Sequence, residues 1–135
     1  MILVDSSAWV EYDRATGSDV DLELTRLIAE GVPIAVTEPI IMEVCAGARS
    51  DSRERDLRRL LARFHLARFD AAADFNAAVT IYRRCRHVGV TPRGLIDCMI
   101  AAVALRQRHE VLAQDRDFAQ VAQVVELRLH PASLV

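Results

Sequence analysis

Four carboxylates interrupt apolar stretches of this 135-residue chain: Asp5, Glu43, Asp97 and Asp115. Asp5 ends MILV, Glu43 separates PIIM from VCAGA, Asp97 separates LI from CMIAAVAL, and Asp115 follows VLAQ. A carboxylate in apolar surroundings is unstable unless it is paired, protonated or bound to a cation. Since four acids in one place would repel one another, the pattern predicts a shared divalent ion.

The predicted ligands carry only oxygen donors, which favours Mg²⁺ or Mn²⁺ over Zn²⁺. We expect Asp5, Asp97 and Asp115 to hold one or two such ions. Glu43 is then either a ligand through water or the group that orients an attacking water. Small residues on the same helical faces, Ala46 and Gly47 beside Glu43 and Ala101 beside Asp97, leave room for an ion and a phosphate.

Each acid also has a purely structural interpretation. Asp97 follows Gly94 by three residues, so it can favour a helix N-terminus through the backbone dipole. Asp5 can cap the end of a strand, and Glu43 can pair with an arginine in the core. These alternatives stay open for each acid taken alone.

The elements that position these acids follow from the apolar pattern, and the composition, 52% hydrophobic and 27% charged, predicts a single domain over residues 1–135. Short apolar runs predict strands at 1–4, 34–36, 66–69, 111–113 and 124–129. Helical periodicity and cap signals predict a short helix after Ser6 and helices near 19–30, 38–47, 51–65, 71–87 and 95–105. Strands separated by helices indicate an α/β fold, with a short parallel sheet of four or five strands sandwiched between helices.

Two of the acids lie just after predicted strands. Asp5 follows residues 1–4, and Asp115 follows residues 111–113. Because ligands bind at the carboxyl ends of parallel strands, we expect both side chains at the same edge of the sheet.

Four sequence blocks resemble the PIN-domain ribonuclease toxins of VapBC toxin–antitoxin modules. The blocks are VDSSAW, EPIIMEVCAGA, RGLIDCMIAAVAL and AQDRDF, and they span nearly the whole chain in the family's order. The resemblance implies an α/β/α sandwich, Mg²⁺- or Mn²⁺-dependent endoribonuclease activity, a homodimer and inhibition by a small VapB-type antitoxin. By position, the family's acids fall on Asp5, Glu43, Asp97 and Asp115, with Asp117 as an auxiliary or alternative fourth acid.

The chain departs from the family pattern at two positions. The family commonly has Arg-Ser before the Ile-Asp pair, whereas Gly94 follows Arg93 here. Many relatives carry a basic residue where this chain has Gln114. Both departures bear on substrate contacts rather than on metal ligands.

An acidic site needs cations around it to attract RNA, although the net charge of the chain is −2. Residues 49–68 contain seven Arg and three acids, a balance of +4, but many of these arginines suit a solvated helix face. Arg84, Arg86 and Arg93 lack such local acidic partners, so we predict that they contact RNA phosphates. Ser7 is predicted to hydrogen-bond a carboxylate or a phosphate.

Three rival functions remain open at this point. A phosphohydrolase with Asp5 as nucleophile needs a second acid where Ser7 stands. A non-catalytic α/β interaction domain would keep the acidic cluster as a structural feature, and its melting temperature would not respond to Mn²⁺. A DNA nuclease would share the metal site and differ in its substrate channel.

Cellular placement follows from the cysteines and the apolar runs. Cys45, Cys85 and Cys98 are odd in number and show no paired spacing, which is typical of a reduced protein. The N-terminus lacks the features of a secretory leader, and no apolar run is long enough to span a membrane. The sequence therefore predicts a cytoplasmic protein.

Overall fold

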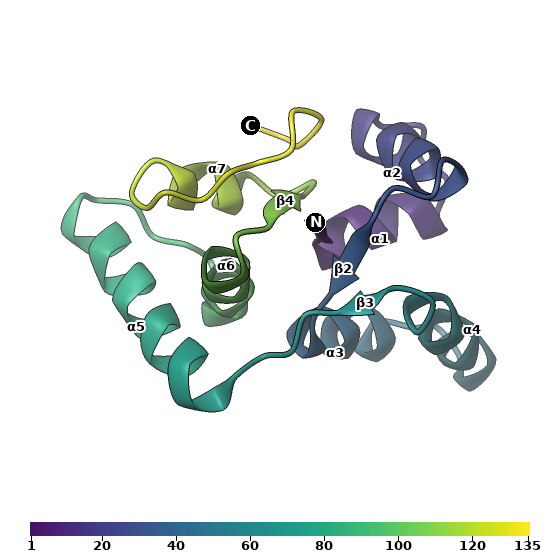
Figure 1. Cartoon of the computed structure of the whole chain (residues 1–135), viewed down its shortest axis with the longest axis horizontal. Helices are drawn as coiled ribbons and strands as arrows, with labels where there is room; N and C mark the ends of the chain where they lie inside the picture. The colour runs from purple at the N-terminus through teal and green to yellow at the C-terminus, as the bar shows by residue number, and fades with distance from the viewer.

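A four-stranded parallel sheet lies at the centre of the computed structural model, which describes residues 1–135 (Figure 1). The strands in spatial order are β3 (His65–Leu66), β2 (Ile34–Val36), β1 (Ile2–Val4) and β4 (Glu110–Leu112). Ile2 pairs with Ile34 on one side and with Glu110 on the other. The predicted short parallel sheet is therefore confirmed, with four strands.

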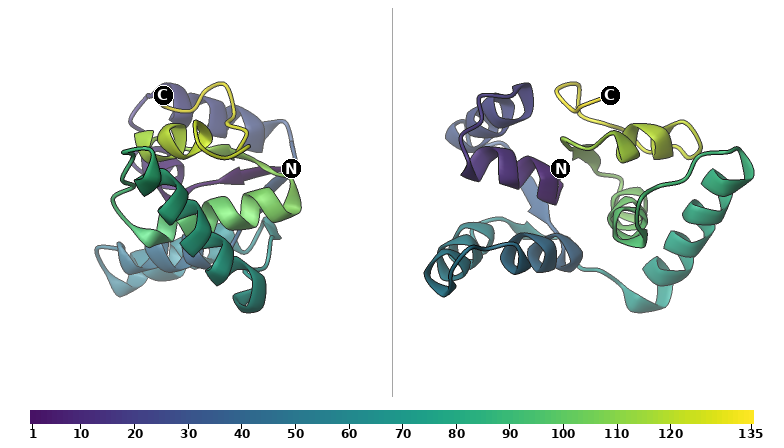
Figure 2. Two further views of the ribbon diagram at one scale, coloured as in Figure 1. Left: turned by 90° about the vertical axis from the view of Figure 1, so that its left-hand side faces the viewer. Right: turned by 180° about the vertical axis from the view of Figure 1, so that it is seen from behind.

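Seven helices surround this sheet. They are α1 (Ser6–Asp13), α2 (Asp19–Ala29), α3 (Glu38–Ala46), α4 (Asp51–Leu61), α5 (Ala71–His87), α6 (Leu95–Gln107) and α7 (Arg116–Ala122). Figure 2 shows α5 flanking α6 on the side away from α1 and α2. None of the helices is long and apolar enough to span a membrane.

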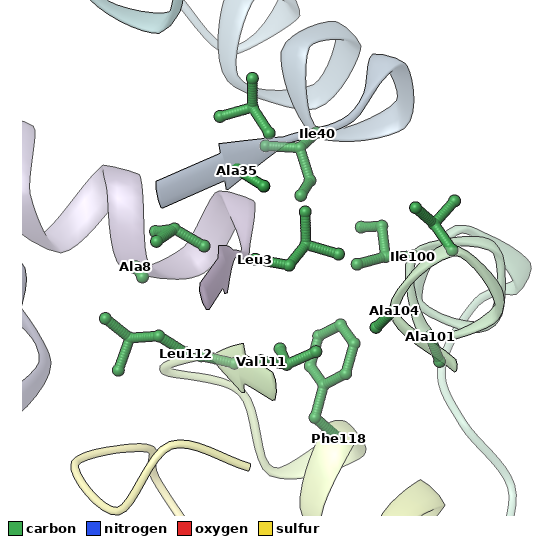
Figure 3. Packing of buried hydrophobic residues seen from close by; sticks show 14 of the residues in the cluster. Leu3, Ala8, Ala35, Ile40, Ile100, Ala101, Ala104, Val111, Leu112 and Phe118 are labelled. Carbon is green, nitrogen blue, oxygen red and sulfur yellow. The ribbon is translucent and has the colours of Figure 1, made fainter. Parts of the chain in front are cut away.

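The core lies on both faces of the sheet, so β1 and β2 are buried throughout and show no alternation of polar and apolar residues. Figure 3 shows Leu3 of β1 between Ala8 of α1 and Ile100 of α6. Residues Ile100 to Ala104 of α6 are all buried. This burial confirms the buried central helix predicted from LIDCMIAAVAL, and it places Asp97 in that helix's first turn.

Two predicted strands differ from the structure. The strand expected at 66–69 is only His65–Leu66, and both of its residues are exposed. The strand expected at 124–129 is wrong: Val124 and Val125 donate their N–H groups back to Val121 in a turn, and a single bridge joins Leu129 to Val111. A run of Val and Leu favours a strand locally, but here the preceding helix uses those backbone donors.

Helix α7 and the end of α4 were also not anticipated. The side chain of Asp115 accepts a hydrogen bond from the N–H of Asp117 and so starts α7 at Arg116. Helix α4 ends at Leu61 rather than at residue 65. Residues 65 and 66 pair with β2 instead, which shows that sheet pairing overrides the helical pattern there.

Candidate functional site

Asp5 is the most deeply buried acid at the carboxyl edge of the sheet, with 2% of its surface exposed. It caps α1: its Oδ2 accepts hydrogen bonds from the Ser7 N–H at 3.0 Å and the Ser7 hydroxyl at 2.6 Å. Its Oδ1 is buried without a hydrogen-bond partner. Burial raises the pKa of Asp5 to about 6, against the opposing effect of the Ser7 hydrogen bonds.

Ser7 also ties the ends of two strands together. Its hydroxyl accepts a hydrogen bond from the N–H of Gln114 at 2.9 Å while donating to Asp5. A backbone donor that follows β4 thus reaches the carboxylate that follows β1 through one side chain. This contact agrees with the predicted role of Ser7 as a partner of a carboxylate.

Glu43 faces the same region from the last turns of α3. Its Oε1 accepts a hydrogen bond from the Ser6 hydroxyl at 2.7 Å, so a neutral donor orients it. No arginine pairs with Glu43, which removes the alternative of a core ion pair for this residue. Glu43 also borders a cleft of about 400 Å³ whose lining includes Arg14 and Arg49.

Asp97 joins the acids into two overlapping groups. One group is Asp5, Glu43 and Asp97, the other is Asp97, Asp115 and Asp117, and each group has ligand atoms within 4.8 Å of one another. Burial raises the pKa of Asp97 to about 8, and the negative charges of the other four acids add to the effect. The acids predicted from apolar settings are therefore neighbours, although they come from distant parts of the chain.

Arg93 pairs with the second group. Its Nη2 lies 2.7 Å from Oδ1 of Asp115, and its Nε lies 3.3 Å from Oδ2 of Asp117. The Arg93 backbone N–H donates to the same Asp117 oxygen at 2.9 Å. The residue predicted to contact a phosphate therefore contacts carboxylates in this structure.

Comparison with known proteins now identifies the family. The PIN domain family model matches residues 2–124. Ribonuclease VapC11 of Mycobacterium tuberculosis is 44% identical over 129 residues, covering 95% of this chain and 96% of that protein. The chain is a PIN domain protein of the VapC ribonuclease family.

A second relative supports the family, and solved structures support the fold. VapC ribonuclease Mb1587 of Mycobacterium bovis is also 44% identical over 129 residues, with 95% of this chain and 96% of that protein covered. VapBC2 from Rickettsia felis bound to a promoter DNA fragment superposes with a TM-score of 0.75 at 16% identity, covering 96% of this chain and 98% of that one. The sarcin–ricin loop cleaving toxin VapC20 of M. tuberculosis gives 0.70 at 21% identity, with 95% and 99% covered.

The two departures from the family pattern have different structural consequences in this PIN domain. Gly94 is the N-cap of α6 in extended backbone, and no side chain caps the helix there. Because the hydroxyl is missing, the backbone N–H groups in the first turn of α6, which contains Asp97, have no side-chain cap. Gln114 uses its backbone N–H to hold Ser7, a contact that does not depend on its side chain.

Arg84 and Arg86 lie on α5, outside the two acidic groups. Neither forms an ion pair, and the guanidinium carbon of Arg86 lies over the ring of Tyr82, 5.9 Å from the ring centroid. Their role as RNA contacts in this PIN domain stays a prediction.

Sequence reasoning missed the hydrogen bond from Ser6 to Glu43 and the contacts of Arg93 with Asp115 and Asp117. In the sequence pattern Ser6 marks only the start of a short helix, although it stands next to Asp5 in VDSSAW. Its hydroxyl reaches Glu43, which is 37 positions away in sequence, so the contact becomes visible only once α3 is placed against α1. Adjacent serines after the strand-end acid are the only sequence signal for it.

Proposed function

We propose that this chain is an endoribonuclease toxin that hydrolyses RNA phosphodiester bonds with Mg²⁺ or Mn²⁺ held by its buried acids. The observation that carries the proposal is Oδ1 of Asp5, a fully buried oxygen without a hydrogen-bond partner in the same group as Glu43 and Asp97. The 44% identity to ribonucleases supports RNA as the substrate.

The residues present fit a hard divalent cation. Every candidate ligand is a carboxylate oxygen, which is the donor type that Mg²⁺ and Mn²⁺ prefer. Burial raises the pKa of Asp97, the negative charges of four other acids add to the effect, and a bound cation would relieve that repulsion. Asp5, Glu43 and Asp97 are the residues that would hold one ion, and Asp97, Asp115 and Asp117 form a second group of possible ligands. When bound, such an ion polarises the scissile phosphate and lowers the pKa of a nearby water.

The chain's own residues orient the groups that take part. Ser7 holds Oδ2 of Asp5 and leaves Oδ1 without a hydrogen-bond partner, while Ser6 holds Oε1 of Glu43. Glu43 is thereby positioned to orient the attacking water. Attack of water at phosphorus expels the ribose 3′ oxygen, so the products carry a 5′-phosphate and a 3′-hydroxyl, and the 2′-hydroxyl takes no part.

Cations beside the acids support a polyanionic substrate. Arg14 and Arg49 line the cleft that borders Glu43, and neither forms an ion pair. We expect RNA phosphates to lie along this cleft, with Arg93, Arg84 and Arg86 as further contacts. A VapB-type antitoxin as partner is supported by the family and by the VapBC complexes among the structural neighbours. The homodimer is proposed on the family resemblance.

The deciding experiment maps new 5′-phosphate ends across total RNA after incubation with the protein and Mg²⁺ or Mn²⁺. Asp97→Asn should remove these ends, because its amide cannot contribute a negative charge to either group. Asp19→Asn, at an exposed acid of α2, is the matched control and should cut as wild type does.

Two outcomes would overturn the proposal. One is the same set of cuts by wild type and Asp97→Asn. The other is cleavage in excess chelator that matches cleavage with metal. If the protein cuts nothing and its melting temperature ignores Mn²⁺, the non-catalytic interaction domain is the better account.

A further inference from the structure

The two acidic groups are neutralised in different ways. Asp5 and Glu43 receive hydrogen bonds only from neutral donors: the hydroxyls of Ser6 and Ser7 and a backbone N–H. Asp115 and Asp117 contact the guanidinium of Arg93. The second group therefore already has a cation of the chain's own, whereas the first has none.

The side chain of Arg93 is free to leave that position. It is 76% exposed, while the side chains of Asp115 and Asp117 are 17% and 9% exposed. An ion pair with one partner in solvent contributes little to stability, so its loss costs the fold little.

The backbone keeps the acids in place when the guanidinium moves. The Arg93 N–H still donates to Asp117, and the Asp117 N–H still donates to Asp115. Departure of the guanidinium would thus leave a preformed pair of carboxylates next to Asp97. A guanidinium and a divalent ion repel each other and would use the same oxygens, so they exclude one another.

Resting on the proposed function, we infer that Arg93 is an exchangeable internal counter-ion of the second acidic group. In the metal-free protein it holds Asp115 and Asp117. A first divalent ion binds at Asp5, Glu43 and Asp97, and a second binds at Asp97, Asp115 and Asp117 only in competition with Arg93. Once displaced, Arg93 projects into solvent beside the acids, where it meets the phosphate of an incoming RNA. Arg93 is a positioning residue in this scheme, because it sets how many ions the acids hold.

Mn²⁺ binding, measured by calorimetry and by the loss of the free-ion signal in electron paramagnetic resonance, tests this inference without any activity assay. Wild type, Arg93→Gln and Arg116→Gln are compared. Arg116 is the matched control because it is exposed, stands next to Asp115 and forms no ion pair with the acids. Both variants remove one positive charge, so a general change in electrostatic attraction affects them equally.

We expect Arg93→Gln to gain a second Mn²⁺ in the concentration range where wild type binds one, or to bind its weaker ion about tenfold more tightly. Arg116→Gln should stay within about twofold of wild type. In chelator, the melting temperature of Arg93→Gln should fall only slightly below that of wild type, because the ion pair is largely exposed, and excess Mn²⁺ should remove the difference.

Equal Mn²⁺ stoichiometry and affinity in all three proteins, with binding and RNA cleavage by wild type intact, would overturn the role of Arg93 alone. Equal gains in both variants would also overturn it, since general electrostatics would then account for the change. Absence of Mn²⁺ binding from all three would overturn the proposed function and this inference together.

Discussion

The five acids of the site differ in what holds their charge. Asp5 has two donors from Ser7, Glu43 has Ser6, and Asp115 and Asp117 share Arg93. The pKa of Asp97 is raised by burial and by repulsion from the other acids, and no hydrogen bond to its side chain offsets these effects. It also belongs to both groups. Of the five acids, Asp97 is therefore the one whose negative charge a bound cation would stabilise most.

Replacing Asp97 with Asn should stabilise the metal-free protein above neutral pH. The carboxyl has a pKa of about 8 in the folded state and its ordinary pKa of 3.8 in the unfolded chain. Unfolding then releases a proton between these pKa values, so this group makes stability fall as pH rises from about 4 to about 8. Asn cannot ionise, and the variant should gain about 1–2 kcal/mol over wild type near pH 8.

Urea unfolding in chelator, near pH 5 and near pH 8, measures this effect. Asp19→Asn should follow the wild-type dependence on pH, since its carboxylate is exposed on α2. An Asp97→Asn protein that loses as much stability with rising pH as wild type would contradict the assignment of the raised pKa to Asp97.

At the scale of elements, the sequence predicts the helices and strands that the apolar pattern buries. It does not predict where backbone hydrogen bonds or side-chain contacts between distant segments decide the structure. The run in residues 95–105 predicts a buried helix because every face is apolar except at Asp97, and α6 is that helix. The strand expected at 124–129 fails because helix α7 and its turn take the backbone donors of Val124 and Val125. The sequence predicts that Arg93 contacts RNA phosphates. Its ion pair with Asp115 joins residues 22 positions apart, so it depends on how these segments pack and cannot be predicted from spacing.

One buried ion pair joins α5 to α6, and sequence spacing does not reveal it. Asp74 of α5 is 1% exposed and accepts hydrogen bonds from Nε and Nη2 of Arg106 at 2.9 and 2.8 Å. Arg106 also donates to the carbonyl of Arg68 in the segment that leads into α5. These contacts hold the outer helix α5 against α6, the helix that carries Asp97 (Figure 1).

Removing this arginine should lower stability through Asp74 rather than through lost attraction. Arg106→Ala leaves a buried carboxylate with the N–H of Asp70 as its remaining donor, and the expected loss is about 2–4 kcal/mol in the free energy of unfolding. Chemical denaturation measures it. Arg58→Ala is the matched control, because Arg58 pairs with Glu54 on the exposed face of α4. A loss no larger than the control's would mean that Asp74 is not stabilised by Arg106.

At the scale of the whole molecule, the parallel sheet turns separation in sequence into proximity in space. Asp5 follows β1 and Asp115 lies beyond β4, and these two neighbouring strands run in the same direction, so both acids reach one edge. Helices α3 and α6 then bring Glu43 and Asp97 to that edge, 38 and 92 positions after Asp5 by residue number. The fold thus brings together negative charges that its neutral hydrogen-bond donors only partly stabilise. On the proposed function, a cation that binds these acids in the folded state alone would stabilise the fold.

Mn²⁺ should therefore stabilise the whole fold, and more strongly at higher pH. An ion that binds only the folded state adds about 2.7 kcal/mol to the free energy of unfolding when its concentration is a hundred times its dissociation constant. Binding requires deprotonated carboxylates, and burial raises the pKa of Asp5 to about 6 and that of Asp97 to about 8, so affinity should increase between about pH 5 and about pH 8. Melting temperatures with Mn²⁺ or with chelator, taken across this range, measure the gain. Asp97→Asn should lose most of it, whereas Asp19→Asn should keep it. A gain that is independent of pH, or that survives in Asp97→Asn, would place the ion elsewhere on the molecule and separate its binding from the acids at the sheet edge.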